Sequence, residues 1–514
     1  MGESISKICC SGPAIVIMDS TVIKKEIENE LLVTQARKHL TKENSEVFKA
    51  NTFISKAVIR NMYYFEEEIG QGAFASVHKA HLKKDKEGKR QFAVKIMQKK
   101  GSKEDIKRMI KEIELMKKLD HPVVNRIYEA YENKLTYSIV IEYCTGGALS
   151  QLMELQNSAF PEEPTREYIF QALQAINYLH QKGIVHRDIK AENFLVVRTG
   201  CTDIKLIDFG LSTTVPSLDA VMSECVGSPF YLAPEVLEKA YTSKCDLWSI
   251  GVMMFILMTG ELPYDCESNS DMFERIRAGN LEMGLIEKSS YSPEAKDLLS
   301  RLLIREKAGR LSAIEAIQHP WFRPNHEKIR EKGLAYLSKG LLERLRSFSY
   351  KSLFQREMTS LIVQFMEGDS KEVEEMQAVF TYLDEDFSGS LSPEEIRQVY
   401  ARHGIELSSQ EVDQLVDSLY FRERAVITYL EFIAATLSPE VIKSEYRIRQ
   451  LFDYIDTNSS GDIDKFEIQD CFLRFGRDLT ESKVARMLEE TGAGNTPTIN
   501  FKQFYCLIQN GSLH

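Results

Sequence analysis

The chain has 514 residues, more than one hydrophobic core usually organises, so we expect two or more domains. A hydrophobic fraction of 43% is ordinary for globular proteins, and a net charge of -11 argues against nucleic acid as a partner. Nine cysteines without paired spacing, and no signal-peptide pattern at the start, predict a cytoplasmic protein with reduced thiols.

Residues 1–61 carry no catalytic pattern and form an N-terminal extension. The opening MGESIS matches the N-myristoylation pattern with Gly2 as acceptor, while Cys9 and Cys10 could accept palmitate. The cysteines matter because one acyl chain holds a membrane only marginally. Glu3 counts against acylation, since it places a charge beside the acceptor. Membrane anchoring through these residues and a free N-terminus therefore remain alternatives.

Residues 62–322 contain two kinds of sequence pattern, one typical of strands and one typical of helices. Short β-rich runs begin at Tyr63, with one amphipathic helix between them at about 104–119, and helical periodicity dominates 148–322. This pattern predicts a small sheet lobe, a larger helical lobe and a cleft between them.

Phosphate-binding residues are predicted at the start of the small lobe. In the string GQGAFASV, Gly70 and Gly72 let backbone amides approach phosphates, while Ala75 replaces the third glycine of the usual pattern. A simple strand turn is the alternative, because a glycine loop alone is weak evidence. Lys95 in FAVKIM would hold the α and β phosphates of ATP, with Glu112 as its ion-pair partner.

The string HRDIKAEN, followed further on by DFG, is the densest motif. Asp188 would accept the proton of a substrate hydroxyl, and Lys190 would neutralise the moving phosphoryl group. Asn193 and Asp208 would bind magnesium. Phosphoryl transfer needs positioning and charge more than covalent chemistry, and these residues supply both.

Together with APE at 233–235, DLWSIG at 246–251 and Arg310, these motifs resemble the eukaryotic protein kinases. The resemblance implies serine/threonine specificity, ATP and Mg2+ as cofactors, and a buried ion pair between Glu235 and Arg310. The catalytic residues that it implies are Asp188, Lys190, Lys95 and Glu112. The nucleotide-binding residues that it implies are Gly70, Gly72, Val77, Ala93, Lys95, Glu142, Cys144, Asn193 and Asp208.

Glu224 occupies the position where many kinases carry an activating phosphothreonine. A fixed carboxylate there could pair with Arg187 of the HRD motif, so we hypothesise that activity needs no phosphorylation of this segment. A solvated surface glutamate is the alternative.

Residues 323–370 read as a junction. The stretch 327–366 is basic and amphipathic, with apolar residues at helical spacing, namely Leu334, Leu337, Leu341, Leu345 and Phe348. A basic apolar helix is the usual target of a calmodulin-like groove, and this one could also cover the substrate cleft. A plain packing helix between domains is the alternative.

The C-terminal part contains an internal repeat, with candidate loops starting at 384, 420, 456 and 492. Apolar residues recur four positions before each loop start and at the eighth loop position. They are Phe380, Val416, Phe452 and Leu488, and Leu391, Ile427, Ile463 and Ile499. This spacing predicts four EF-hands in two pairs, joined within each pair by a short β-bridge.

Calcium ligands persist only in the first and third loops. They are Asp384, Asp386, Ser388, Ser390 and Glu395, and Asp456, Asn458, Ser460, Asp462 and Glu467. The second loop places Tyr420, Arg422 and Arg424 at ligand positions, and the fourth runs from Gly492 to Gln503. We expect these two loops to pair with the others without binding an ion.

The whole order resembles the calcium-dependent protein kinases of plants and alveolate protists. The resemblance implies a multidomain chain, in which an α+β bilobal protein kinase fold precedes an all-α, calmodulin-like EF-hand domain. The expected boundaries are 1–61, 62–322, 323–370, 371–440 and 441–514.

The implied function is calcium-activated transfer of the ATP γ-phosphate to serine or threonine hydroxyls of protein substrates. The junction helix would block the cleft of this monomer at low calcium, and the loaded EF-hands would bind the helix and release the cleft. Two alternatives are a calcium-responsive pseudokinase scaffold, which the intact Lys95, Asp188 and Asp208 disfavour, and a constitutive kinase with decorative EF-hands.

The loop sequences predict two calcium ions per chain. Calorimetry on the 370–514 fragment counts them directly, and four bound ions would contradict the assignment of the second and fourth loops.

Overall fold

The computed structural model describes residues 54–513 with short gaps. These gaps are 56, 73–74, 86–89, 101, 157–158, 265, 267, 280–282, 351, 367–370, 420–425, 476–480 and 491–497. The acylation residues Gly2, Cys9 and Cys10 lie outside the described residues. Within the described part, no helix has both the length and the apolar character needed to cross a membrane.

The small lobe is a five-stranded antiparallel sheet in the order β1-β2-β3-β5-β4. Its strands are β1 (Tyr63–Gln71), β2 (Ala75–Leu82), β3 (Gln91–Gln98), β4 (Ile127–Glu132) and β5 (Thr136–Glu142). A capping box between Ser102 and Asp105 begins the helix α4 (Lys103–Met116), and a short helix, α3 (Ile59–Met62), precedes β1. The predicted sheet lobe with one amphipathic helix is therefore confirmed.

The large lobe is mostly helical and is built around α8 (Lys244–Thr259), which is buried over nearly its whole length. The surrounding helices are α5 (Leu149–Gln156), α6 (Glu162–Gln181), α7 (Pro234–Leu237), α9 (Asn269–Ala278), α10 (Met283–Lys288), α11 (Pro293–Leu302) and α12 (Ala313–Ile317). Two short antiparallel strand pairs, β6 (Ile184–Val185) with β9 (Thr213–Thr214) and β7 (Phe194–Val196) with β8 (Ile204–Leu206), frame the predicted catalytic segments. The side chains of Arg310 and Glu235 form a buried pair, with Nη2 and Oε2 3.1 Å apart.

The junction contains three helices rather than the single helix predicted over 327–366. They are α13 (Arg323–Tyr336), α14 (Lys339–Ser347) and α15 (Leu353–Met366). The Ser338 side chain caps α14, so the helical spacing breaks there, and Leu334 is 43% exposed rather than buried. The predicted anchors Leu337, Leu341 and Leu345 are buried.

The C-terminal helices form four helix-loop-helix units. They are α16 (Lys371–Leu383), α17 (Pro393–Arg402), α18 (Ser409–Leu419), α19 (Tyr429–Thr436), α21 (Glu445–Ile455), α22 (Lys465–Arg474), α23 (Glu481–Glu490) and α24 (Phe501–Asn510), with a short α20 (Pro439–Ile442) between the pairs. Leu391 pairs with Ile427 in the bridge of β10 (Ser390–Leu391) and β11 (Ile427–Thr428). Ile463 pairs with Ile499 in the bridge of β12 (Asp462–Asp464) and β13 (Thr498–Asn500), so the predicted pairing of loops is confirmed.

Helix α15 lies between the two EF-hand pairs and contributes to their common core. Its side chains Phe354, Met358, Leu361 and Val363 are fully buried among residues of both pairs. Helix α13 instead crosses α16 closely: a Cβ atom on Gly333 would lie 2.2 Å from Cβ of Tyr382. The EF-hand domain thus holds the later part of α13, α14 and α15, while the start of α13 packs on the kinase through His326 and Lys328.

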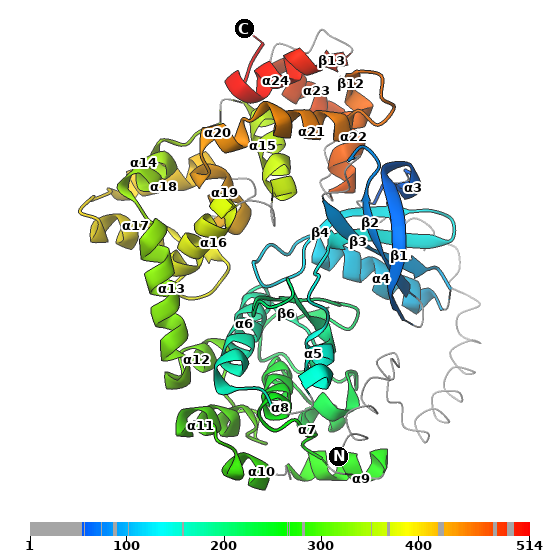
Figure 1. The fold of residues 1–514 in the computed structure, drawn as a ribbon, viewed down its shortest axis with the longest axis vertical. Coiled ribbons are helices and arrows are strands. Elements are labelled where there is room, and N and C mark those ends of the chain that lie inside the picture. Colours follow the sequence, from blue (N-terminus) through cyan, green and yellow to red (C-terminus); the bar gives the residue numbers. More distant parts are fainter. Residues whose placement is uncertain are drawn as a thin grey trace, which may run out of the picture.

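The EF-hand domain packs beside both lobes of the kinase, and α22 lies against β4 of the small lobe (Figure 1). The buried Glu129 carboxylate in β4 accepts hydrogen bonds from the hydroxyls of Tyr63 and Tyr131, and from Tyr454 of α21 across the interface. Arg474 is fully buried beside them, with its guanidinium 4.5 Å from the Tyr454 ring centre. A buried polar cluster therefore joins the small lobe to the second EF-hand pair.

Breaking the pair between Glu235 and Arg310 should destabilise the large lobe strongly. Arg310→Met leaves the Glu235 carboxylate buried without its counter-ion, which costs about 3–5 kcal/mol of unfolding free energy. Tryptophan fluorescence during urea unfolding reports this lobe, because both tryptophans of the chain, Trp248 and Trp321, lie in it.

The control is Glu238→Gln, which removes an exposed ion pair with Arg305. It should cost less than about 1 kcal/mol. Equal losses for the two variants would contradict a structural role for the buried pair.

Candidate active site and calcium loops

The ion pair expected between Lys95 and Glu112 is formed. Lys95 Nζ on β3 lies 2.6 Å from Glu112 Oε1 on α4 and 3.6 Å from Asp208 Oδ1. Burial opposes the lysine charge, but the two carboxylates outweigh it and raise the pKa of the Lys95 amine. The charge of Lys95 also lowers the pKa of Asp208. A fixed cation and a fixed anion therefore face each other beside the central strand of the sheet.

Asp188 is held by three neighbours in the catalytic loop. Asn193 Nδ2 donates to the backbone oxygen of Asp188 at 2.7 Å, and Lys190 Nζ lies 3.0 Å from Asp188 Oδ2. Ser228 Oγ donates to Asp188 Oδ1 at 2.7 Å and accepts from Lys190 Nζ at 2.8 Å. Three of the predicted residues thus come together around one carboxylate, and Ser228 was not predicted.

The backbone of the catalytic loop rests on Asp246, a residue of DLWSIG to which the sequence analysis gave no role. Its buried carboxylate accepts from the backbone N–H groups of His186 at 2.9 Å and Arg187 at 2.8 Å. Arg187 has φ 68, a conformation that a non-glycine residue adopts only when its surroundings impose it. Asp246 is therefore a positioning residue.

Phe209 of DFG packs its ring against the catalytic loop, with its centre 5.2 Å from that of the His186 ring.

The predicted nucleotide-binding residues of the small lobe lie on or beside strands β1, β2, β3 and β5. Gly70 on β1 lies beside Val77 on β2. At the turn between these strands, the N–H of Gly72 donates to the backbone oxygen of Ala75 at 2.7 Å. Ala93 is buried on β3, opposite β5. The tip of the glycine loop, 73–74, lies outside the described residues.

The hinge follows β5. Glu142 ends this strand, and its carboxylate pairs with Lys205 at 2.9 Å, while Cys144 is buried just beyond it. The Glu142 side chain is therefore engaged on the large lobe, so any contact of this residue with a nucleotide would come through its backbone.

Glu224 pairs with Arg187, as the sequence hypothesis expects. Arg187 Nη1 donates to Glu224 Oε2 at 2.8 Å and to the Tyr241 hydroxyl at 3.2 Å. The hydrogen bond from Arg187 lowers the pKa of Glu224, which keeps this glutamate charged. The activation segment is thus tied to the catalytic loop by a carboxylate supplied by the chain itself.

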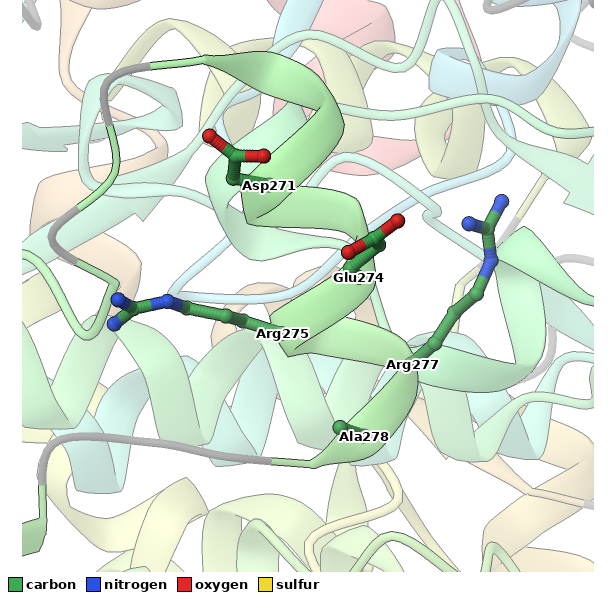
Figure 2. Close-up of a pocket in the computed structure, with 5 residues that line it drawn as sticks. All are labelled: Asp271, Glu274, Arg275, Arg277 and Ala278. Carbon is green, nitrogen blue, oxygen red and sulfur yellow. The ribbon is translucent and has the colours of Figure 1, made fainter.

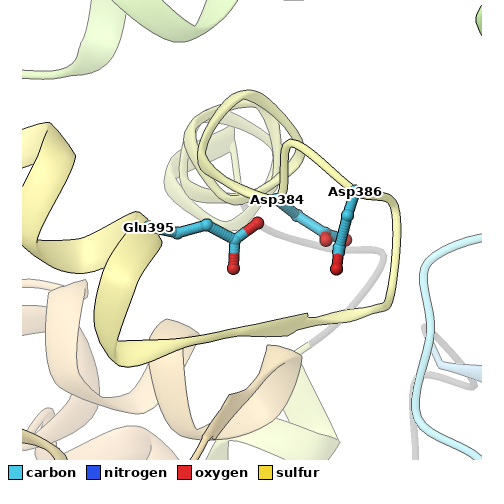
Figure 3. A group of neighbouring side chains, drawn as sticks. All are labelled: Asp384, Asp386 and Glu395. Atoms are coloured by element: carbon cyan, nitrogen blue, oxygen red, sulfur yellow. The ribbon is translucent and has the colours of Figure 1, made fainter.

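The first calcium loop gathers three carboxylates. Asp384, Asp386 and Glu395 turn their oxygens toward one space, and one oxygen of each lies within 4.8 Å of the others (Figure 3). Backbone N–H groups of Ser388 and Gly389 donate to Asp384, at 2.8 and 2.9 Å. Burial and the adjacent carboxylates still raise the pKa of Asp384 well above its usual range. Such a crowded, anionic oxygen set fits a divalent cation.

The third loop repeats this backbone pattern. The N–H groups of Ser460 and Gly461 donate to Asp456 at 3.0 Å, and the Thr457 N–H donates to Glu467 at 2.9 Å. Asn458 accepts a second bond from Ser460, while Asp462 begins the β-bridge. In the first loop, Ser390 holds the position of Asp462. The first ligand positions of loops two and four fall within 420–425 and 491–497, which lie outside the described residues.

A surface depression lies on α9, away from these sites. Figure 2 shows Arg275 and Arg277 extending to opposite sides of the helix, with Asp271, Glu274 and Ala278 between them. None of these residues belongs to the predicted catalytic or calcium sets, so we assign the depression no function.

The cleft and the loops are the parts of a protein kinase followed by calcium-binding EF-hands. The protein kinase domain family matches residues 63–322, and the EF hand family matches 376–400 and 448–473. Calcium-dependent protein kinase 3 of Plasmodium berghei (strain Anka) is 32% identical over 449 residues, which cover 85% of this chain and 78% of the relative. Calcium-dependent protein kinase 17 of Arabidopsis thaliana is 31% identical over 465 residues, which cover 88% and 84%.

The chain therefore belongs to the calcium-dependent protein kinases. The predicted family, fold class and serine/threonine kinase activity are confirmed, with ATP, Mg2+ and Ca2+ as cofactors. Calcium regulation of a kinase that acts on protein substrates follows from the same membership.

Reversing the charge at Glu224 should reduce phosphotransfer in calcium. Glu224→Arg replaces a charge-assisted hydrogen bond by repulsion against Arg187, and we expect kcat/KM to fall about tenfold, which corresponds to about 1.4 kcal/mol. Steady-state kinetics on a peptide substrate in saturating calcium measures the change.

Glu224→Asp keeps a carboxylate and serves as the matched control, with kinetics close to those of the unmodified chain. If Glu224→Arg also leaves the kinetics unchanged, Glu224 is only a solvated surface residue.

Proposed function

We propose that this kinase is held inactive at low calcium by its junction and is released when two EF-hand loops bind calcium. The observation that carries the proposal is the position of α15. Its apolar side chains are buried between the two EF-hand pairs while the pair of Lys95 and Glu112 is formed at 2.6 Å. The junction is thus captured by the EF-hands in an arrangement whose catalytic residues are assembled.

In the proposed transfer, the bond between the γ-phosphorus and the leaving oxygen of ADP breaks as a bond to the substrate hydroxyl oxygen forms. Asp188 accepts the hydroxyl proton, and Lys190 balances the charge on the moving group. Lys95, oriented by Glu112, holds the α and β phosphates. Asn193 and Asp208 would hold magnesium, which would supply positive charge to the β and γ phosphates.

Calcium would act by favouring one of two arrangements of the junction. The ligand sets of loops one and three support one ion each, so two ions are proposed per chain. A ligand shifts such an equilibrium only by its difference in affinity for the two arrangements. Calcium must therefore bind more tightly when α14 and α15 lie in the EF-hand core than when they cover the cleft.

The location of the protein follows from its N-terminal extension. We propose a cytoplasmic monomer, with Gly2, Cys9 and Cys10 as acyl acceptors that would place it at a membrane. The supporting observation is the MGESIS pattern alone.

Paired assays in calcium and in EGTA test the proposal. Phosphotransfer should rise at least tenfold on adding calcium, and Asp188→Asn should abolish it in both conditions. Glu395→Gln and Glu467→Gln each remove one of two oxygens donated to an ion, and each should raise the calcium concentration needed for half-maximal activity.

Two other results would reject the proposal. Equal rates in calcium and EGTA would support a constitutive kinase with decorative EF-hands. Absence of phosphotransfer in both conditions, from a chain that binds calcium, would support the pseudokinase scaffold.

A further inference from the structure

The first calcium loop is packed against the large lobe of the kinase. Phe387, at the fourth position of the loop, is only 7% exposed and belongs to the kinase core rather than to the EF-hand core. Its ring lies 5.8 Å from Phe170 of α6, in an edge-on orientation, and 5.9 Å from His326 of α13. Phe170 also contacts Phe322, so Phe387 completes an aromatic cluster.

Polar contacts fix the same loop on α6. The buried amide of Asn177 donates to the backbone oxygens of Asp386 and Phe387, at 3.0 and 2.9 Å. Gly389 has φ +74 and sits so close to Tyr178 that a Cβ atom would lie 2.5 Å from that ring. Three successive parts of the loop therefore meet one helix of the kinase.

These contacts alternate along the chain with the predicted calcium ligands. Asp384 and Asp386 would provide ligand oxygens, while the backbone oxygen of Asp386 and the residues Phe387 and Gly389 contact α6. The N–H of Gly389 donates to Asp384 at 2.9 Å, so the backbone that supports the ligand also faces Tyr178. The loop cannot change its backbone at these positions without changing the contact.

The third calcium loop provides an internal comparison. It has the same backbone hydrogen bonds, and Ser459, at the position of Phe387, has φ 57 against 52 for Phe387. Yet Ser459 is exposed, and nothing lies within 4 Å of the Cβ position of Gly461. Of the two loops, only the first is shaped as a contact surface for α6.

We propose that calcium loop one is itself the surface by which the first EF-hand pair docks on the large lobe, with Phe387 as its anchor. Calcium binding to loop one and docking on α6 are then one linked equilibrium, while loop three binds calcium independently of α6. The proposal rests on calcium binding to loop one, as proposed above. Linkage is reciprocal, so a change on the kinase surface must alter the calcium affinity of loop one.

The test is calcium calorimetry on the full chain carrying Glu467→Gln, which disables loop three and leaves loop one to report. Phe387→Ser, which installs the loop-three residue, and Asn177→Leu, which lies outside the EF-hands, should each weaken calcium binding about tenfold. Ser459→Ala is the matched control and should have no effect. Hydrogen exchange of the α6 segment around Asn177 should slow in calcium, and Phe387→Ser should remove this protection.

The outcomes separate the two proposals. Phe387→Ser could lower the calcium affinity while Asn177→Leu leaves it unchanged. This result would mean that Phe387 acts within the loop alone, and it would overturn the docking proposal. The docking proposal would also be overturned if both variants kept the calcium affinity of the parent and α6 exchanged hydrogen equally slowly in calcium and in EGTA. If the Glu467→Gln parent binds no calcium, the calcium role of loop one fails first, and the linkage fails with it.

Discussion

The arrangement of this protein depends on the burial of α15. Most of its surface is hidden from water, because its apolar side chains and the polar Gln355, Glu357, Thr359 and Ser360 are all buried. The apolar side chains Phe354, Met358, Leu361 and Val363 make such a helix stable only when a core covers them. Helix α15 is joined to the kinase through α13 and α14. The domain that encloses α15 therefore also determines the position of the junction. In the proposed mechanism, calcium sensing and access to the cleft therefore compete for this one segment.

The two EF-hand pairs contact the kinase by different chemistry. Pair two meets the small lobe through a buried polar cluster, in which Glu129 accepts from three tyrosines beside the cation of Arg474. Pair one meets the large lobe through an aromatic ring and two amide hydrogen bonds. A buried charge cluster tolerates little misplacement, because an unpaired charge is costly, whereas an aromatic contact is more forgiving. The small lobe, which carries Lys95 and α4, therefore receives the stricter of the two contacts.

The sequence predicted the contacts that short motifs and repeats determine. The catalytic pairings of Lys95 with Glu112 and of Arg187 with Glu224 follow from motifs, and the bridges at Ile427 and Ile499 follow from a repeat. The break at Ser338 was missed because leucine spacing alone does not reveal a cap.

The contact of Asn177 with Phe387 was also missed, because the two residues are 210 positions apart. No periodicity relates them. The one available sign was a phenylalanine at the fourth position of the loop, in addition to the expected apolar Leu391 at the eighth.

The close crossing of α13 and α16 limits how the domains can move. With Gly333 pressed against Tyr382, any displacement along either helix axis would bring a bulkier neighbouring side chain into the contact. Closely packed interfaces exchange between discrete arrangements and do not deform continuously. The two helices therefore fit together in one relative position, and they should move as a unit or separate completely. A graded rise in calcium would then change the fraction of molecules in each arrangement, with no partly shifted form between them.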